Sequence, residues 1–249
     1  MTEPLLASEA LRLVETAEDG GIPVRLIGGA AIWCRASERA RHLFGREFED
    51  LDVVAYKRSS RALRDLLENE GYEPERVFNA THGAGRLLYH SANGSYDVDV
   101  FLDAFDMSHK LDLGDRIEVE APTLPAADLL LTKLQIAELN RKDASDTLML
   151  LWDHDLADKD GPHSLNVQRV CELCGGDWGL FTTINDNLGR TREVVDEFDL
   201  DVAERSELVA KIDALTQAMT DAPKTARWKV RARVGRRVKW YEVPEEVVR

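Results

Sequence analysis

The sequence has few cysteines and no long hydrophobic run, and its first residues do not fit the pattern of an export leader. Three cysteines among 249 residues are an odd and small number, which does not fit a disulfide framework. No apolar run approaches the ~20 residues that a membrane span needs. The N-terminal residues Met1-Thr2-Glu3-Pro4 lack the basic and then apolar layout of a signal peptide. We therefore expect a soluble, cytoplasmic protein.

Two of the cysteines, Cys171 and Cys174, form a Cys-x-x-Cys pair. A structural zinc site needs about four ligands, and no second Cys/His pair at finger-like spacing follows this one. The histidines His82, His90 and His109 also show no spacing typical of metal ligands. We expect the two cysteines to be ordinary helix residues and the three histidines to be polar or core residues.

Basic residues are outnumbered by acidic ones and are concentrated near the C-terminus. The formal charge of the chain is −14, and the segment 224–239 carries eight basic residues and no acid, which leaves −22 on the rest. Such an acidic body repels nucleic acid at long range, so a polyanion would have to meet a local basic surface. Either this segment contacts a triphosphate or an RNA backbone, with Trp228 and Trp240 as stacking surfaces, or it packs on the acidic body and offsets its charge. The eight basic residues are Lys224, Arg227, Lys229, Arg231, Arg233, Arg236, Arg237 and Lys239.

The hydrophobic pattern predicts an α+β protein with a mixed sheet and flanking helices, followed by an α-helical C-terminal domain. With 44% hydrophobic residues the chain can bury a core, and its length fits one large or two small domains. We predict a first domain over 1–122 and a helical domain with the basic segment over 123–249. The predicted elements of the first domain are a helix over Leu5–Ala17, a strand over Val24–Ile27, a turn and helix from Gly28, a charged loop over Arg35–Glu49, a strand over Leu51–Tyr56, a helix over Arg61–Asn69, a hairpin of Arg86–His90 and Tyr96–Phe101, and a strand over Arg116–Val119.

Carboxylates and glycines gather at the predicted sheet. Gly28-Gly29 follows the first strand directly, Asp50 and Asp52 enter the second, and Asp97 and Asp99 lie on the second hairpin strand. Side chains of a strand alternate between its two faces, so each aspartate pair shares one face. Clustered carboxylates repel one another unless a cation lies between them, and such oxygen ligands suit Mg²⁺ or Mn²⁺. The backbone N–H groups of a glycine pair at a helix start suit phosphate oxygens.

The run Ile27-Gly28-Gly29, then Asp50-Leu51-Asp52-Val53, then Val98-Asp99-Val100 resembles the signature of the DNA polymerase β-like nucleotidyltransferase superfamily. The resemblance spans about the first half of the chain and implies that Asp50, Asp52 and Asp99 are metal ligands and catalytic residues, with Gly28 and Gly29 against the nucleotide. Many members carry serine after the first glycine, where this chain has Gly29. Asp99 rather than Asp97 is the implied ligand because Val98 and Val100 flank it, and Asp97 then is a solvent-facing companion.

A second resemblance lies in the other half of the chain. Lys133, followed by Arg141-Lys142-Asp143 and Asp146, is similar to a segment of AbiEii-like nucleotidyltransferases of toxin–antitoxin and phage-defence systems. On one continuous helix, Lys133 and Arg141 would lie on one stripe about 12 Å apart at ~1.5 Å per residue, which suits a polyphosphate. Alternatively Lys133 is a simple exposed lysine, and Asp143 and Asp146 form a helix N-cap and its third residue.

The predicted activity is transfer of a nucleoside monophosphate from an NTP, such as ATP, to an acceptor, with release of pyrophosphate and with Mg²⁺ or Mn²⁺ as cofactor. RNA or tRNA, a protein hydroxyl and a small molecule all remain open as the acceptor. The alternative is a non-catalytic nucleotide- or partner-binding protein that keeps the fold.

Overall fold

The computed structural model describes residues 5–243, which form two compact units. We call the first the sheet unit and the second the helical unit. Neither is one continuous stretch of chain, because short segments before and after the central strands cluster with the helices. The predicted domain boundary between residues 122 and 123 stays a prediction. The described sheet unit comprises 5–35, 46–106 and 111–125, and the described helical unit comprises 36–45, 107–110 and 126–243.

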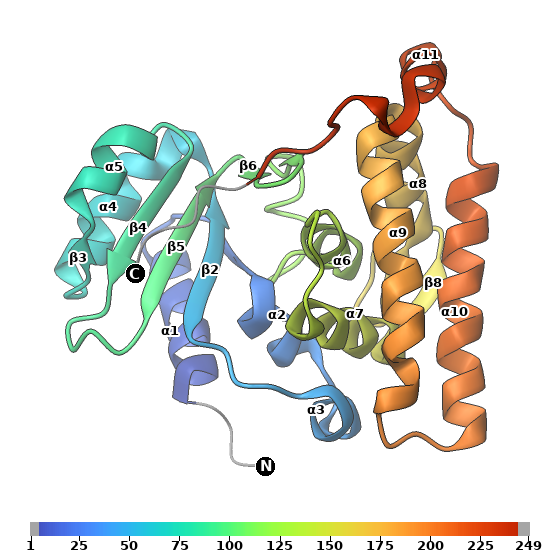
Figure 1. The fold of residues 1–249 in the computed structure, drawn as a ribbon. Helices are drawn as coiled ribbons and strands as arrows, with labels where there is room; N and C mark the ends of the chain where they lie inside the picture. Colours follow the sequence, from blue (N-terminus) through green and yellow to red (C-terminus); the bar gives the residue numbers. More distant parts are fainter. Residues whose placement is uncertain (1–4, 244–249) are drawn as a thin grey trace. The chain divides into compact units, whose positions relative to one another are not determined.

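A five-stranded mixed sheet lies at the centre of the sheet unit (Figure 1). Its strand order is β1-β2-β5-β4-β3, and β2 and β5 are parallel whereas the other neighbours are antiparallel. The predicted α+β class with a mixed sheet is thus confirmed. The main elements of this unit are α1 (Leu5–Asp19), β1 (Val24–Ile27), α2 (Gly28–Arg35), β2 (Asp50–Ala55), α4 (Ser60–Asn69), β3 (Glu73–Pro74), α5 (Arg76–His82), β4 (Arg86–His90) and β5 (Asp97–Leu102).

The period-two pattern of the central strands explains how they pair. Leu51 and Val53 of β2 and Val98 and Val100 of β5 are at most 1% exposed, and they alternate with the aspartates. The register pairs apolar with apolar and aspartate with aspartate. One face of the two strands is therefore buried core, and the other carries the aspartates over its first half and the buried pair Val54 and Phe101 beyond them. The predicted hairpin of β4 and β5 is confirmed, and its turn uses Gly94 with a φ of +66°.

One predicted strand is wrong, and β2 begins one residue earlier than expected, at Asp50. Residues 116–119 form consecutive turns, in which the N–H of Arg116 donates to Leu113 and that of Val119 donates to Arg116. Backbone N–H and C=O groups that bond to each other within turns are not available to pair with a neighbouring strand. Instead, the segment 122–124 lies beside β1, where the N–H of Leu26 donates to the Pro122 carbonyl at 3.0 Å.

The helical unit holds a group of helices in which α8, α9 and α10 run side by side (Figure 1). The residues 5–243 contain eleven α-helices in all. A small parallel pair of strands, β8 (Asp155–Ala157) and β9 (Ser164–Asn166), accompanies the helices. A two-stranded sheet of β6 (Ala104–Asp106) and β7 (Lys110–Asp112) belongs, apart from Lys110, to the sheet unit. The elements of the helical unit are α3 (Glu38–Phe44), α6 (Ala126–Leu134), α7 (Arg141–Asp153), β8 (Asp155–Ala157), β9 (Ser164–Asn166), α8 (Val167–Gly176), α9 (Trp178–Val194), α10 (Val202–Asp221) and α11 (Ala226–Val234).

Helix α3 lies in a segment that the sequence predicted to be a charged loop. Its N-cap is Ser37, whose hydroxyl accepts from the N–H of Ala40 at 3.1 Å. Its Phe44 is buried edge-on against Trp152 and Phe198, with ring centroids 5.7 Å and 5.0 Å apart. The packing of Phe44 against these two distant aromatic residues stabilises the short helix. Helical periodicity in the sequence does not reveal such a contact.

The three cysteines are free thiols, and Cys171 and Cys174 are helix residues, as predicted. These two lie on α8, and burial raises the pKa of the Cys174 thiol far above its ordinary value, so this thiol is protonated and unreactive. Among residues 5–243, no helix combines the length and the apolar character that crossing a bilayer requires.

Candidate functional site

The glycine turn after β1 touches the second aspartate of β2. Gly28 begins α2 with a φ of +67°, a backbone conformation that glycine adopts without strain. A Cβ atom at this position would lie 2.1 Å from Oδ2 of Asp52, closer than any real contact. The glycine is therefore required twice, for its dihedral angle and for the space that the carboxylate takes. In this way the turn and the strand that the sequence singled out meet at one point.

Four aspartates lie on the polar face of β2 and β5 in two adjacent rows. In the parallel register Asp50 is opposite Asp97, and Asp52 is opposite Asp99. Asp50, Asp52 and Asp97 are partly exposed, whereas Asp99 is 8% exposed. The sequence predicted pairs on each strand, and the strand register joins the two pairs into one carboxylate cluster.

Asp99 is held by an arginine of the neighbouring strand. Nε of Arg86 donates to Oδ1 of Asp99 at 2.8 Å, and its Nη2 donates to the other carboxylate oxygen, so the pair is bidentate. The guanidinium also lies over the Phe101 ring at 4.9 Å. The arginine satisfies a nearly buried carboxylate whose charge would otherwise be costly.

Asp97 has a different partner, the histidine opposite it on β4. Nδ1 of His90 is 2.7 Å from Oδ1 of Asp97, and its Nε2 is 3.6 Å from Glu75. The hydrogen bond to Asp97 raises the pKa of His90 above its ordinary value. Arg86 is not among the residues predicted from the sequence, and His90 has no predicted role at the cluster. The signal was the spacing Arg86-x-Leu88-x-His90, which puts both cations on one strand face, but only the pairing of β4 with β5 identifies their partners.

A second arginine lies against the glycine turn. The Arg46 guanidinium would be 2.7 Å from a Cβ atom added to Gly29, so a side chain at Gly29 would displace it. Nη1 of Arg46 donates to the Glu47 carbonyl at 2.9 Å. Serine, which many nucleotidyltransferases carry here, would collide with this arginine. Gly29 therefore leaves room for the Arg46 guanidinium at the position where the resemblance implies a phosphate group.

The donor chemistry of Asp50 and Asp52 fits a divalent cation, whereas that of Asp99 fits only in part. Partly exposed carboxylates on one strand face are the oxygen ligands that Mg²⁺ and Mn²⁺ prefer. Asp99 gives both oxygens to Arg86 and would have to share them or exchange its partner. Within residues 5–243, no group of three or more His, Cys, Asp or Glu side chains is arranged as a metal site.

Lys133 and Arg141 belong to the helical unit and do not lie on one helix. Helix α6 ends at Leu134 and α7 begins at Arg141, so the predicted shared stripe is wrong. The two residues are separated because the chain leaves helical geometry at Gln135, whose side chain accepts from the N–H of His109 at 2.6 Å.

Lys133 is buried, which excludes the alternative of a simple exposed lysine. Its Nζ lies 3.1 Å from Asp143 and 2.9 Å from Asp146, both of which are also buried. The N-cap of α7 is Asn140, whose Oδ1 accepts from the N–H of Asp143, so the expected capping roles are shifted by three residues. The two aspartates instead neutralise the lysine.

Arg141 is exposed at the first turn of α7 and forms an ion pair with Glu197 at 2.9 Å. Its guanidinium lies 5.2 Å from the centroid of Phe198.

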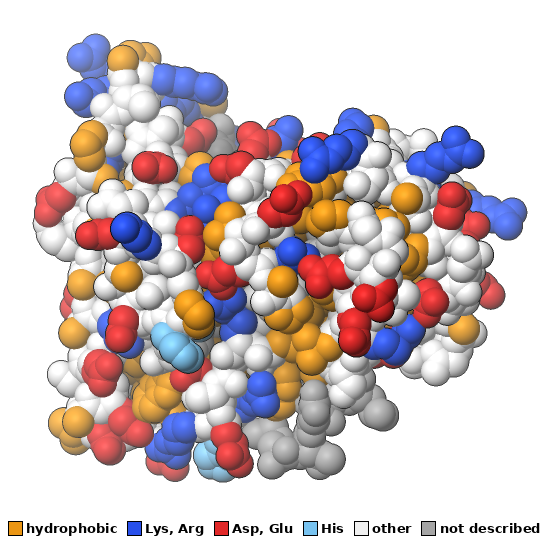
Figure 2. Space-filling view, turned by 180° about the vertical axis from the view of Figure 1, so that it is seen from behind, with side chains coloured by type: hydrophobic (Ala, Val, Ile, Leu, Met, Phe, Trp, Pro, Cys, Tyr) orange, Lys and Arg blue, Asp and Glu red, His pale blue; other side chains and the backbone are white. Residues whose placement is uncertain are grey.

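Basic and aromatic side chains of the C-terminal segment interleave at α11, and Figure 2 shows Lys and Arg side chains gathered at its upper left, over this helix. Arg231 lies 4.6 Å over Trp178 and donates to two backbone carbonyls, while Arg236 is bidentate to Asp186 at 2.7 and 2.8 Å. These two arginines therefore have structural partners. Nε1 of Trp240 donates to Thr183. The exposed basic residues of the segment are Arg227, Lys229, Arg233, Arg236, Arg237 and Lys239.

Comparison of the sequence with models of known protein families finds no match, and comparison with curated protein sequences finds none that is significantly similar. The motifs and the geometry of the sheet unit are therefore what supports a function.

Proposed function

We propose that this chain is a nucleotidyltransferase with the DNA polymerase β-like fold, which transfers a nucleoside monophosphate from an NTP to an acceptor. The observation that carries the proposal is the meeting of three motifs at one place. Asp52 is the register partner of Asp99, and its carboxylate touches the Gly28 backbone. Such a meeting does not follow from any one motif alone. We also propose that the protein works in the cytoplasm, where NTPs are made.

The proposed step exchanges one phosphorus–oxygen bond for another bond to phosphorus. The acceptor hydroxyl or amine bonds to the α-phosphorus while the bond to the bridging oxygen of the β-phosphate breaks. Pyrophosphate leaves with that electron pair, and the proton of the acceptor passes to a carboxylate of the cluster, for which Asp99 is our candidate. Divalent cations held by Asp50 and Asp52 would neutralise charge on the α-phosphate and on the departing pyrophosphate.

The chain's own groups would bind and orient the nucleotide. The N–H groups at the start of α2 and the positive end of that eight-residue helix offer donors to phosphate oxygens. The Arg46 guanidinium beside Gly29 adds a cation at the same place. Lys133 has no assigned role here, because two aspartates already neutralise it. The contribution of Arg141 to nucleotide binding stays a prediction.

A second candidate function, nucleotide binding without catalysis, is favoured by the Arg86–Asp99 pair. A carboxylate with both oxygens engaged by a guanidinium has to share those oxygens or exchange its partner before it can accept a proton or bind a cation. A protein that only binds nucleotide has no need to do either. Pyrophosphate release separates these two functions.

The test is to incubate the protein with Mg²⁺, each labelled NTP and total cell lysate, and to measure pyrophosphate and label in RNA, protein and small molecules. Asp52→Asn should abolish transfer while the protein stays folded, because it removes a charged oxygen and relieves repulsion. The matched control is Asp65→Asn, at a position of α4 away from the cluster. Asp99→Asn should lose more activity than Asp97→Asn. Transfer at the parental rate by Asp52→Asn would refute the site, and NTP binding without pyrophosphate release would favour the second function.

A further inference from the structure

Helix α11 of the helical unit packs on one side and is exposed on the other. None of its nine residues is buried. It packs against α8 and α9, where the Trp228 ring lies 5.5 Å from the centroid of Phe181. On the exposed side, Val230 and Val234 lie one helical turn apart and are 62% and 40% exposed. These two valines form a short apolar stripe that no other part of residues 5–243 covers.

A pocket of about 530 Å³ opens beside the valine stripe. Its lining combines the stripe with Trp178 at the start of α9, with Trp240 of the C-terminal segment and with Arg227. The rings of Trp178 and Trp240 stand edge to face, with their centroids 5.9 Å apart. The volume lies within the ~300–1,000 Å³ typical of ligand sites. The valines are therefore part of a concave apolar surface rather than isolated exposed side chains.

Hydrogen bonds hold the wall of this pocket in place. Nε1 of Trp240 donates to the Thr183 hydroxyl at 3.1 Å, and Nε2 of His109 lies 2.8 Å from the same hydroxyl. Arg231 donates to two backbone carbonyls of the segment that follows α11, at 2.7 and 2.8 Å. The pocket is thus preorganised, so little affinity is lost to ordering it when a ligand binds.

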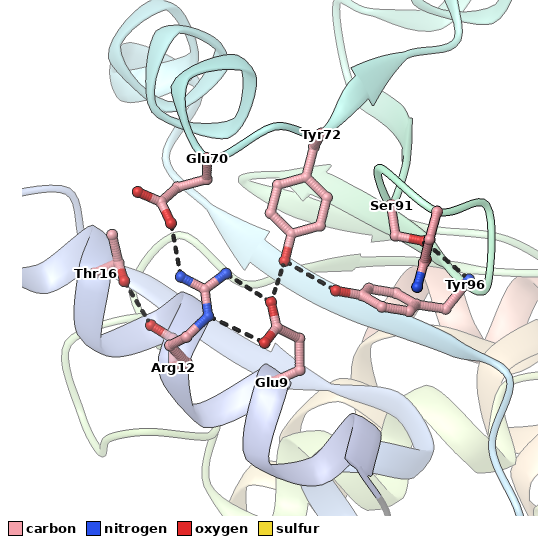
Figure 3. Close-up of polar contacts among 8 residues, drawn as sticks. Glu9, Arg12, Thr16, Glu70, Tyr72, Ser91 and Tyr96 are labelled. Carbon is pink, nitrogen blue, oxygen red and sulfur yellow. Dashed lines mark hydrogen bonds and ion pairs between the residues drawn. The ribbon is translucent and has the colours of Figure 1, made fainter.

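An arginine of the sheet unit shows how this chain commonly neutralises its cations. The Arg12 guanidinium donates to Glu9 and to Glu70, at 2.6 Å in each pair (Figure 3). The Tyr72 hydroxyl also lies 2.9 Å from Glu9. The positive charge of Arg12 is therefore offset within the chain.

The cations around α11 differ from Arg12, because the segment 224–239 contains no acid (Figure 2). The lining of the pocket includes one carboxylate, Asp177, which caps α9 by accepting from the N–H of Leu180 at 2.8 Å. At about 0.15 M salt the Debye length is ~8 Å, so the cations next to the pocket outweigh more distant acids. A negatively charged partner is therefore favoured. The exposed cations of the segment that form no ion pair within residues 5–243 are Arg227, Lys229, Arg233, Arg237 and Lys239.

The aromatic rings and the valines favour a protein segment over RNA or a lipid surface. A nucleic-acid base stacks on an open ring face, but Arg231 lies 4.6 Å over Trp178 and Arg236 lies 5.2 Å over Trp240. Apolar side chains anchor a protein in a bilayer when they project from its surface, whereas both rings are partly buried in the pocket wall. Exposed valines gain free energy when they are buried against apolar side chains of a peptide.

We propose that α11 and this pocket bind an acidic amphipathic segment of a partner protein. An apolar side chain of the segment enters the pocket between the valine stripe and the tryptophan rings. Its carboxylates pair with Arg227 on one side of the stripe and with Lys229 and Arg233 on the other, as the helical spacing of these residues places them. Tryptophan and arginine are the residues that most often carry binding energy in protein interfaces. The proposal does not depend on the proposed function.

The test is fluorescence anisotropy of a labelled synthetic peptide with the full chain at about 0.15 M salt. The peptide has about 18 residues, which is about five helical turns, with leucine at the i, i+3, i+4 and i+7 positions and glutamate at the others. A scrambled peptide of the same composition and a peptide with lysine in place of glutamate are the control probes. Oligouridylate of similar length and co-sedimentation with phosphatidylserine vesicles test the other two kinds of anion.

A first double variant tests the charges beside the pocket. Arg227→Gln with Arg233→Gln removes one cation from each side of the valine stripe. The matched control is Arg61→Gln with Arg76→Gln, on two exposed arginines of α4 and α5 that also form no ion pair within residues 5–243. Both double variants change the net charge by the same amount, so general electrostatic attraction affects them alike.

A second double variant tests the apolar stripe. Val230→Ser with Val234→Ser removes the stripe and leaves every charge in place. The matched control is Val77→Ser with Val202→Ser, at two valines that are 77% and 87% exposed and do not line the pocket. Because all four valines are exposed, we expect all variants to keep the parental circular dichroism spectrum.

We expect one acidic peptide to bind per chain, with roughly fivefold weaker affinity in the arginine variant and roughly tenfold weaker affinity in the valine variant. Each control should change the affinity by less than about twofold. No binding of the acidic peptide, equally tight binding of the scrambled or lysine peptide, or equal weakening in a variant and its control overturns the proposal. Binding of oligouridylate or vesicles that these variants weaken, without binding of the peptide, assigns the surface to that anion instead and also overturns the proposal.

Discussion

Replacing Gly28 by alanine should destabilise the protein in two separable ways. The first cost is conformational, because a φ of +67° is unfavourable for a residue with a Cβ atom by about 1–2 kcal/mol. The second is steric, because the new Cβ atom would be 2.1 Å from Oδ2 of Asp52 and 2.9 Å from its Cγ. Moving a fixed side chain to relieve such overlap costs roughly 1–3 kcal/mol more.

Gly21→Ala is the matched control for the conformational cost. Gly21 has a φ of +70° and no atom within 4 Å of the position that its Cβ would take. Urea unfolding followed by circular dichroism gives the free energy of unfolding of each variant, and parallel slopes show that the unfolded state is unchanged. We expect Gly28→Ala to lose roughly 1–3 kcal/mol more than Gly21→Ala. We also expect it to lose the proposed nucleotide transfer, because Asp52 is displaced.

A double-mutant cycle identifies the atom responsible. In an Asp52→Ala background the nearest remaining obstacle is Cβ of residue 52, at 3.1 Å. The extra cost of Gly28→Ala should therefore shrink by at least half in that background. Equal losses for Gly28→Ala and Gly21→Ala, or the same extra cost in both backgrounds, would show that the glycine turn and Asp52 do not touch as described.

Two further outcomes concern charged groups outside this contact. Lys133→Met should lower the free energy of unfolding by about 3–5 kcal/mol, since it leaves buried carboxylates without their cation. The exposed control Lys142→Met should change this free energy by less than about 0.5 kcal/mol. A loss below about 1 kcal/mol for Lys133→Met would contradict the structural role of Lys133. The raised pKa of His90 stabilises the fold at pH values below the ordinary pKa of 6.5, and this contribution is lost as pH rises through the raised value. In NMR titrations His90 should titrate above 6.5 and shift downward in Asp97→Asn, and a titration unaffected by Asp97→Asn would refute the assignment.

Local chemistry in the sequence determined much of the sheet unit. A period of two fixes which residues of a strand share a face, so the aspartate pairs on β2 and β5 were predictable. Asn93-Gly94 favours a tight turn, so the hairpin was also predictable. The glycine pair after β1 likewise marked the start of α2, because few other residues adopt a positive φ.

Only the tertiary structure decided which of these groups meet. The parallel pairing of β2 with β5 joins strands about 45 residues apart, and strand register depends on packing that no local pattern encodes. The Arg86–Asp99 pair follows from the same sheet, since a side chain's partner across a sheet is set by alignment and not by sequence distance. The break between α6 and α7 likewise depends on distant contacts, such as that of Gln135 with His109, which outweigh helical spacing. The sequence determined which chemical groups each strand presents, and long-range packing decided their neighbours.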